Sequence, residues 1–273
     1  MKKRIMLPSS SSLFHFTRKS SVFKKILKNG LMYFESVEYC PNDDISANLA
    51  YKNNGIYIIP MICFCDIPIS RTLVHRKTYG NYAIGFNKEY LRTKLLDTIN
   101  PVNYVSNPMY AYNLAILKQN LDTKIQENSN RLLYDKDFKS EVDKECKIIH
   151  SLLSYFKPYE YYDEREWRAI LPEKNKWGST TATWFGNNST IIEHIKAFRK
   201  ITKATNIYLS FTSGELANAI SHVIVPKEDD INKFVEYILK EQNQIFGCTK
   251  VSKEERIVLI SKITSFERIE NDY

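Results

Sequence analysis

A histidine and a threonine near the start of the chain could hold a small polar ligand. His15, Phe16 and Thr17 end a short apolar stretch that predicts a strand, and Ser20 begins a segment with helical spacing. A neutral histidine offers a hydrogen-bond donor and an acceptor, and threonine adds a hydroxyl, so His15 and Thr17 together could bind a ribose or an amide. The alternative is that they only cap a turn.

A second polar cluster lies in the stretch Glu164-Arg165-Glu166-Trp167-Arg168. If this stretch is a strand, Glu164, Glu166 and Arg168 lie on one face, with the two carboxylates about 7 Å apart. Two carboxylates in this arrangement can bind a sugar hydroxyl and stabilise the positive charge that develops when a glycosidic bond breaks. The alternative is a solvent-facing ladder of ion pairs on an edge strand.

A third cluster begins inside an apolar run. Asp66 interrupts this run, and a carboxylate in such a place must be paired, must cap the following turn, or must face a site. His75 and Arg76 follow, and Arg76 could bind a phosphate. Tyr79 and Tyr82 could stack on a nicotinamide ring or on a base.

Other residues of reactive type give weaker signals. His222 has neither an acidic residue nor a cysteine beside it, which is typical of a core or strand-end histidine. Cys63 and Cys65 would share one face of a strand, but a tetrahedral metal site needs a second pair with suitable spacing, so no metal is expected. The five cysteines have no CxxC spacing, which indicates free thiols.

The excess positive charge is concentrated at the start of the chain. The chain has 39 basic and 31 acidic residues, and its net charge of +8 equals the charge of residues 1–30, which contain no acidic residue. A basic end suits an anionic partner such as nucleic acid, although a solvated helix face has the same pattern. The basic residues on or beside the predicted helix are Arg18, Lys19, Lys24, Lys25 and Lys28.

The first half of the chain predicts strands joined by short helices. A helix is expected from Ser20 to Gly30, residues 31–55 are mostly loop by composition, and a buried strand, or two strand pieces, begins at Ile56. Pro60 is expected at an edge or a bulge, where its missing N–H does no harm. The other predicted elements are a helix from 70, a strand over 82–86, a helix from 87 and a strand over 101–105.

The second half begins with two long segments of helical period, which predict a helical insertion over 109–157. Thr212 and Glu215 have the spacing of a capping box. The other predicted elements are a helix over 191–203 and strands over 207–211 and 222–225, with a helix over 229–240 and a terminal strand over 257–263. The expected fold is α+β, with a mixed, mainly antiparallel sheet and surrounding helices in a single domain over 1–273, of which 1–12 is a flexible basic tail.

Several common functional classes lack their motifs in this sequence. There is no P-loop, GxGxxG, HExxH or GxSxG motif, which argues against common phosphate-binding, zinc-protease and hydrolase sites. No apolar run approaches the roughly 20 residues that span a bilayer, and the N-terminus lacks the apolar region of a signal peptide. We therefore expect a cytoplasmic protein without membrane contact.

A set of motifs is spread over most of the chain between residues 13 and 226. These stretches are FHFT, KKILKNG, PMICFCDIPIS, HRKTYGNYAIGF, PVNYV, EREWR and ISHVIVP. Together they resemble the AbiGi family of bacterial abortive-infection proteins. The resemblance implies a role in resistance to bacteriophage, in which AbiGi proteins are the antitoxin-like partner of a nucleotidyltransferase toxin.

The order of polar residues also resembles ADP-ribosyltransferases of the diphtheria-toxin type. These begin with a histidine on a strand, place a tyrosine in mid-chain and end with a catalytic glutamate. The resemblance implies NAD as substrate, with His15 and Thr17 holding a ribose and the carboxamide, and Glu166 binding the ribose 2′-hydroxyl. Glu164 could exchange roles with Glu166. The tyrosine that stacks on nicotinamide would be Tyr57, Tyr79 or Tyr82, and Arg168 would join the cofactor-binding residues.

Two main hypotheses follow from these patterns. The first is a phage-defence enzyme that transfers ADP-ribose from NAD to a nucleic acid or a protein. The second is a non-catalytic antitoxin or regulatory protein that binds a co-encoded toxin, or nucleic acid, through its basic N-terminal segment. A third, weaker hypothesis is a metal-independent nuclease that uses His15, Glu164 and Glu166.

Overall fold

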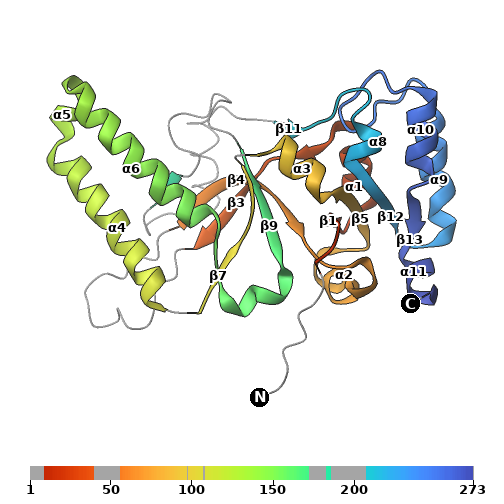
Figure 1. Cartoon of the computed structure of the whole chain (residues 1–273), viewed down its shortest axis with the longest axis horizontal. Coiled ribbons are helices and arrows are strands. Elements are labelled where there is room, and N and C mark those ends of the chain that lie inside the picture. The colour runs from red at the N-terminus through yellow and green to blue at the C-terminus, as the bar shows by residue number, and fades with distance from the viewer. Residues whose placement is uncertain are drawn as a thin grey trace, which may run out of the picture.

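Nine strands form one sheet in the computed structural model, which describes residues 9–39, 56–96, 98–106, 108–171, 183–185 and 207–272 (Figure 1). The strand order is β13-β12-β5-β1-β4-β9-β6, and β3 and β10 also pair with β4. Only β12 and β13 pair in parallel within this sheet, so the predicted α+β fold with a mainly antiparallel sheet is confirmed. The strands are β1 (Ser12–Thr17), β3 (Phe34–Tyr39), β4 (Ile56–Cys65), β5 (Tyr82–Asn87), β6 (Ile99–Pro101), β9 (Glu166–Ile170), β10 (Thr183–Phe185), β12 (Ile220–Val225) and β13 (Ile263–Ser265).

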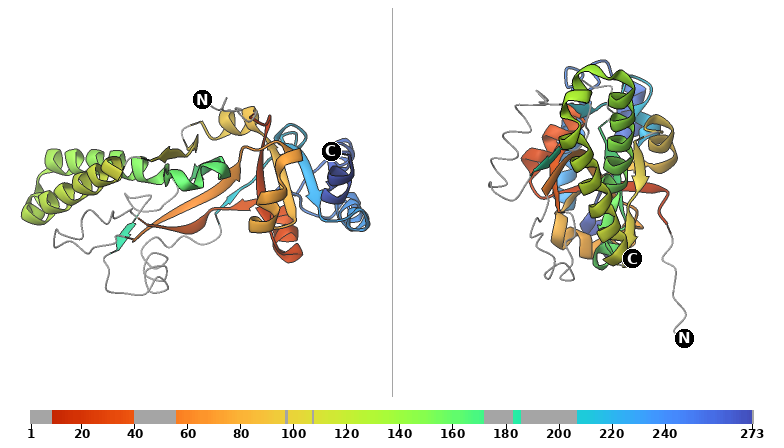
Figure 2. Two further views of the ribbon diagram at one scale, coloured as in Figure 1. Left: turned by 90° about the horizontal axis from the view of Figure 1, so that it is seen from below. Right: turned by 90° about the vertical axis from the view of Figure 1, so that its left-hand side faces the viewer.

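Two short strand pairs and a set of helices surround this sheet (Figures 1 and 2). The pairs are β2 (Leu31–Met32) with β11 (Tyr208–Leu209), and β7 (Asn103–Val105) with β8 (Phe156–Pro158). The helices are α1 (Ser20–Asn29), α2 (Leu73–Tyr79), α3 (Lys88–Lys94), α4 (Pro108–Glu127), α5 (Ser129–Tyr134), α6 (Lys136–Ser154), α8 (Leu216–Ala219), α9 (Glu228–Leu239), α10 (Lys253–Ile260) and α11 (Phe266–Asp272), with the 3-10 turns η2 (Ile69–Arg71) and η3 (Tyr159–Glu164).

Helix α1 covers one face of the sheet as the sequence predicts. Phe23, Ile26 and Leu27 are buried at helical spacing, while the lysines of the helix point to solvent. The helix ends at Gly30, whose φ of 91° lies in the left-handed region. A Cβ at this position would lie 2.2 Å from the carbonyl oxygen of Leu209, so only glycine fits between α1 and β11.

The sheet opens beside its long central strand, β4. On one side of β4, β3 pairs along Ile56–Met61, whereas β1 pairs only at Cys65, opposite Phe14. On the other side, β9 pairs continuously from Met61 to Cys65. The stretch 62–64 of β4 therefore has β9 on one side and, among the described residues, no strand on the other. This gap between β1 and β3 leaves room for a pocket within the sheet.

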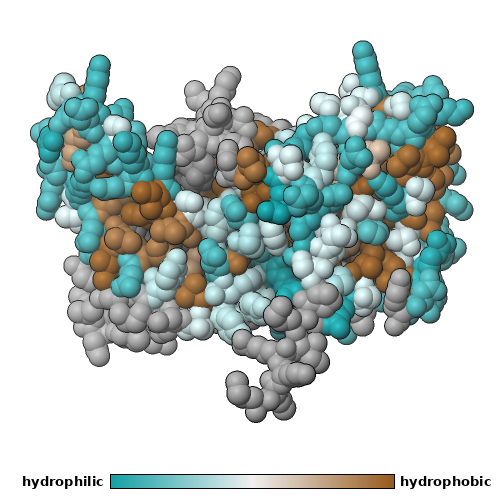
Figure 3. Space-filling model, in the orientation of Figure 1, coloured by the Kyte–Doolittle hydropathy of each residue, from teal (hydrophilic) through white to brown (hydrophobic). Residues whose placement is uncertain are grey.

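Helices α4 and α6 lie side by side and project from the sheet (Figures 1 and 2). They confirm the two predicted helical segments, and Leu121 and Phe138 are part of the apolar cluster that joins them to Ile59 of β4 and Ile170 of β9. Leu117 of α4 and Ile148 of α6 are exposed. Figure 3 shows apolar patches on this part of the surface. The single domain and the exact limits of the insertion stay predictions.

Three element predictions need correction. Residues 31–39 form β2 and β3 rather than loop; residues 40–55 lie outside the described part. The predicted terminal strand over 257–263 is mostly helix α10, in which Ser252 caps the N-terminus and Leu259 is buried, and β13 begins only at Ile263. Pro60 lies inside β4, opposite Glu35 of β3, instead of at a sheet edge. The predicted helix over 191–203 lies outside the described residues.

Candidate active site

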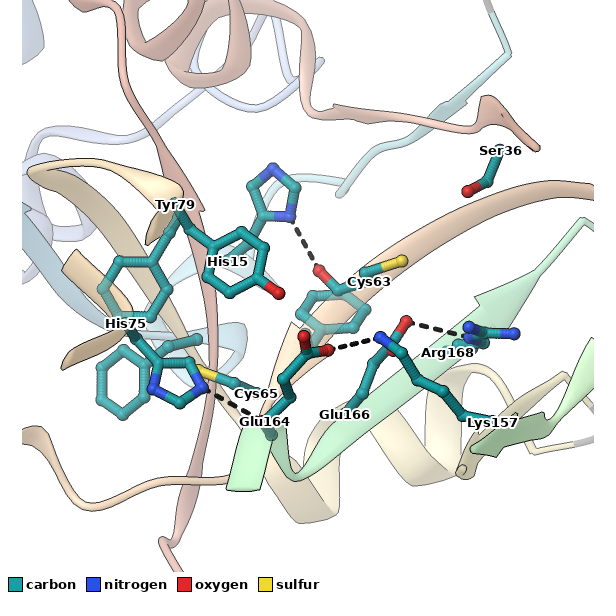
Figure 4. Close-up of a pocket in the computed structure, with 13 residues that line it drawn as sticks. His15, Ser36, Cys63, Cys65, His75, Tyr79, Lys157, Glu164, Glu166 and Arg168 are labelled. Atoms are coloured by element: carbon teal, nitrogen blue, oxygen red, sulfur yellow. Dashed lines mark hydrogen bonds and ion pairs between the residues drawn. The ribbon is translucent and has the colours of Figure 1, made fainter. Parts of the chain in front are cut away.

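A pocket of about 260 Å³ opens at the gap beside β4 (Figure 4). Its wall combines residues from β1, β3, β4, α2, β8, η3 and β9, which are far apart in sequence. Figure 4 shows Tyr79, Lys157, Glu164 and Glu166 pointing toward one another, with Arg168 beside Glu166 and the ring of His15 directed at the carbonyl of Cys63. The histidines, the tyrosine and the charged residues of the wall are His15, His75, Tyr79, Lys157, Glu164, Glu166 and Arg168.

Glu166 is the most firmly held acid of the pocket. Its Oε1 accepts a hydrogen bond from Nε of Arg168 at 2.9 Å, and its Oε2 accepts one from Nζ of Lys157 at 2.7 Å. Its backbone N–H donates to the hydroxyl of Tyr104 at 2.6 Å. Burial opposes ionisation of Glu166, but the charges of Arg168 and Lys157 outweigh it and lower the pKa of this carboxyl. Glu166 is therefore a fixed carboxylate at neutral pH.

The surroundings of β9 exclude the alternative of a solvent-facing ion-pair ladder. β9 lies between β4 and β6, so it is not an edge strand. Arg168 is only 1% exposed, and its guanidinium also donates to the carbonyl oxygen of Ser154 at 2.9 Å. Placing a guanidinium and a carboxylate out of water is costly unless both are paired, as they are here.

Glu164 lines the same pocket, but it belongs to a 3-10 turn, whereas Glu166 belongs to strand β9. It is the last residue of η3 and not part of the strand, and Arg165 between the two glutamates has a φ of 44°. This left-handed residue turns the chain from η3 into β9. Lys157 donates to Glu164 as well as to Glu166, and the hydroxyl of Tyr79 donates to Glu164. Lys157 therefore joins the two carboxylates.

His15 closes the gap in the sheet with its side chain. Nδ1 of His15 lies 2.9 Å from the carbonyl oxygen of Cys63, in the stretch of β4 between its partners β1 and β3. A carbonyl can only accept, so Nδ1 holds the proton and Nε2 has a free lone pair. Burial lowers the pKa of His15, although the bond to Cys63 opposes this shift. His15 is thus a neutral acceptor at the pocket.

His75 and Tyr79 come from the short helix α2. Nε2 of His75 lies 3.3 Å from the backbone oxygen of Glu164, and burial lowers the pKa of His75. Tyr79 is 40% exposed at the pocket, and burial of its hydroxyl together with the bond to Glu164 raises its pKa. Gly80 ends the helix with a φ of 120°, where a Cβ would lie 2.4 Å from the backbone of Thr17. This close approach holds α2 against β1.

Other predicted site residues are not brought to this pocket. The ring of Tyr82 packs 5.0 Å from Phe23, and Thr17 pairs with Tyr82 at the end of β1 without lining the pocket. The side chain of Tyr57 lies outside the described residues, and its backbone is at the opposite end of β4 from Cys65. His222 packs against Phe14, as expected of a core or strand-end histidine.

The remaining predicted polar residues stabilise the fold. Asp66 forms an ion pair of 2.7 Å with Lys88 and accepts a hydrogen bond from the backbone of Ser10. Arg76 pairs with Glu270 and does not line the pocket. Among the described residues, no group of three or more His, Cys, Asp or Glu side chains could hold a metal ion, and no helix is long and apolar enough to cross a membrane.

The five basic residues on or beside α1 are exposed and lie outside the pocket. Arg18 uses its guanidinium to donate to the carbonyl oxygen of Thr78, which links the start of α1 to α2. The other four are Lys19, Lys24, Lys25 and Lys28.

Sequence reasoning missed two residues that organise the pocket. Lys157 stands before a proline at the end of a helical segment, where it indicated only a helix end, and Tyr104 lies in a short strand that had no site signal. Both act through Glu166, and nothing in their own sequence neighbourhood indicates that contact.

Comparison with known proteins settles the family. A family model described as abortive phage resistance protein AbiGi, antitoxin, matches residues 35–224. The chain belongs to the AbiGi family of abortive phage resistance proteins. The chain is also similar to the abortive phage resistance protein AbiGi of Lactococcus lactis subsp. cremoris, with 25% identity over 267 residues that cover 88% of this chain and 97% of the relative. No solved structure matches the chain.

These findings confirm the predicted family and its role in phage defence. The matched range of the AbiGi model contains Tyr79, Lys157, Glu164 and Glu166, whereas His15 precedes it. The description of the family as antitoxin fits a toxin as partner.

Proposed function

We propose that this AbiGi protein acts in phage defence by cleaving NAD at the nicotinamide–ribose bond and transferring ADP-ribose to an acceptor. One observation supports this proposal above others. His15, Tyr79 and Glu166, which the sequence places in the order seen in ADP-ribosyltransferases, line a single pocket. They come from β1, α2 and β9, so only the fold brings them together.

Glu166 would stabilise the transition state of bond cleavage. When the bond between ribose C1′ and nicotinamide N1 breaks, its electron pair leaves on N1 and nicotinamide departs as a neutral ring. Positive charge then develops on the ribose, where a carboxylate bound to the 2′-hydroxyl stabilises it. An oxygen or nitrogen of the acceptor forms the new bond to C1′, and its proton passes to Glu164 or to water.

His15 and Tyr79 would bind the nicotinamide end of NAD. The free lone pair on Nε2 of His15 can accept from an amide N–H or a ribose hydroxyl. Tyr79 presents a partly exposed ring at the pocket, where it could stack on a planar nicotinamide. Thr17 and Tyr82, which do not line the pocket, have no role in this proposal.

The size of the pocket fits part of a dinucleotide. A volume of about 260 Å³ lies just below the usual range for small-ligand sites, roughly 300–1,000 Å³. The nicotinamide and its ribose would occupy the pocket, while the rest of NAD would extend outside it. Lys157, already bound to both glutamates, would keep them in place.

The direct test is to incubate the purified protein with NAD and measure released nicotinamide. We expect release above that of a blank, and His15→Ala and Tyr79→Ala should reduce it by more than tenfold in variants that circular dichroism shows to be folded at the assay temperature. Absence of nicotinamide release with NAD alone and with added nucleic acid or cell protein would overturn the proposal.

A second candidate is a non-catalytic antitoxin, which the description of the family as antitoxin favours. In this case the protein would bind a co-encoded toxin, and its pocket would have no reaction to perform. Co-expression with the neighbouring gene tests it. Growth rescue that is equal for the wild type and Glu166→Gln supports this candidate, and loss of rescue with Glu166→Gln argues against it.

A further inference from the structure

A groove lies between α1 and α9, and none of its lining residues belongs to the pocket of the candidate active site. It encloses about 390 Å³, with Lys24 on the α1 side and Lys233, Glu236 and Lys240 on the α9 side. The sequence predicted a basic face on α1 alone. The fold adds two lysines from the C-terminal part of the chain to the same groove.

The charges of the groove favour an anionic ligand. Lys24 and Lys240 are exposed, and neither forms an ion pair with a residue in the described part of the chain. Lys233 pairs with Asp230 at 2.9 Å and remains 66% exposed. Glu236 is the acid that lines the groove, so the three lysines outnumber Glu236 and the Asp230 carboxylate that pairs with Lys233.

The walls of the groove are joined before any ligand binds. The ring of Phe23 on α1 meets the ring of Phe234 on α9 edge to face, with 5.1 Å between the ring centroids. The backbone N–H of Phe246 donates to Leu27 at 2.6 Å, and that of Gly247 donates to Lys28 at 2.9 Å. A preformed groove loses little entropy when a ligand binds.

Polar and aromatic groups complete the wall beside the lysines. The hydroxyl of Tyr237 donates to the carbonyl oxygen of Gln244, and the side-chain N–H of Asn243 donates to the carbonyl oxygen of Tyr237. These bonds hold Tyr237 in place, and Gln242, which also lines the groove, is exposed. A tyrosine ring can stack on a base, and a glutamine amide can bind the edge of one.

We propose that this α1–α9 groove binds a single strand of nucleic acid. Lysines attract phosphates, and a groove of about 390 Å³ has the volume of a small-ligand site. A single strand can present an unpaired base to Tyr237 and Gln242, whereas the bases of a duplex are paired and stacked. Lys25 and Lys28, exposed on α1, extend the positive surface beyond the groove. Binding in the groove does not depend on NAD cleavage, so the two proposals stand or fall separately.

Fluorescence anisotropy with labelled single-stranded DNA, single-stranded RNA and duplex DNA over a range of salt concentrations tests the groove. We expect a single strand to bind more tightly than the duplex. Lys24→Glu with Lys240→Glu should weaken binding by at least tenfold and reduce the slope of log K against log salt by about 1.4, since each phosphate contact of a single strand contributes roughly 0.7. Glu236→Gln should strengthen binding, because it removes the negative charge.

The matched control reverses two exposed lysines of α6, Lys139→Glu with Lys144→Glu, and should change affinity much less. Equal loss in this control would show that only net charge matters and would overturn the proposal. Lack of single-strand binding at low salt, stronger binding to the duplex, or weaker binding by Glu236→Gln would also overturn it. Equal melting temperatures show that the variants are folded.

Discussion

Oε1 of Glu166 lies 2.9 Å from Nε of Arg168, two residues along the same strand, and both side chains are buried. Side chains two residues apart point to the same face of a strand, so the fold can hold a carboxylate and its cation together without a loop. Lys157 adds a second cation from the end of the helical segment. The candidate active site is therefore built around the carboxylate of Glu166, whose negative charge is stabilised by the cations Arg168 and Lys157.

Arg168→Leu should destabilise the protein by about 3–5 kcal/mol, because it leaves the buried carboxylate of Glu166 with one cation fewer. Urea unfolding gives the free energy of unfolding. The double variant, with Glu166→Leu added, should be more stable than Arg168→Leu alone, since it removes the unpaired charge. A loss below 1 kcal/mol for Arg168→Leu would show that the pair is not held as the structure describes.

Lys157→Met should move the acid limb of NAD cleavage to higher pH. Lys157 and Arg168 lower the pKa of Glu166, so the wild type keeps this carboxylate ionised at mildly acidic pH. Without Lys157 the pKa rises, and a larger fraction of Glu166 is protonated at the same pH. The pH profile of nicotinamide release measures the shift. Lys144→Met, on α6, is the control, and an unchanged profile for Lys157→Met would contradict the prediction.

Arg165→Val should be less stable than Arg165→Gly by about 1–2 kcal/mol. Both variants lose the same side chain, but a β-branched residue at a φ of 44° meets steric repulsion that glycine avoids. Thermal unfolding compares the two variants directly. Equal stability would show that the chain between Glu164 and Glu166 does not need the left-handed conformation.

The parts of the fold with strong local patterns could be predicted from sequence. Helix α1 buries Phe23, Ile26 and Leu27 at helical spacing, and α6 has an equally clear pattern. β3 could not be predicted, because its strand conformation depends on pairing with β4 along its whole length. Helix α10 was mistaken in part for a strand because its apolar residues at 257–260 are consecutive.

From the sequence, only some of the polar residues of the candidate site could be predicted, and not the way in which they are arranged. His15, Tyr79, Glu164, Glu166 and Arg168 all line the pocket, in keeping with their unusual positions beside apolar strands. The choice among the tyrosines, and the contribution of Lys157, depend on which strands pair. The strand pairing leaves a gap between β1 and β3 along β4, and no local sequence pattern predicts this gap.

The central claim is that Glu166 supports cleavage of NAD, and Glu166→Gln tests it most directly. The substitution keeps the shape of the side chain and removes its charge, and Glu141→Gln, an exposed residue of α6, is the matched control. Released nicotinamide is measured with wild type and both variants at equal concentration and with confirmed folding. We predict a loss of at least a hundredfold for Glu166→Gln, on the order of the 2.7 kcal/mol that this factor represents, and none for Glu141→Gln. Equal nicotinamide release by wild type and Glu166→Gln would contradict the claim.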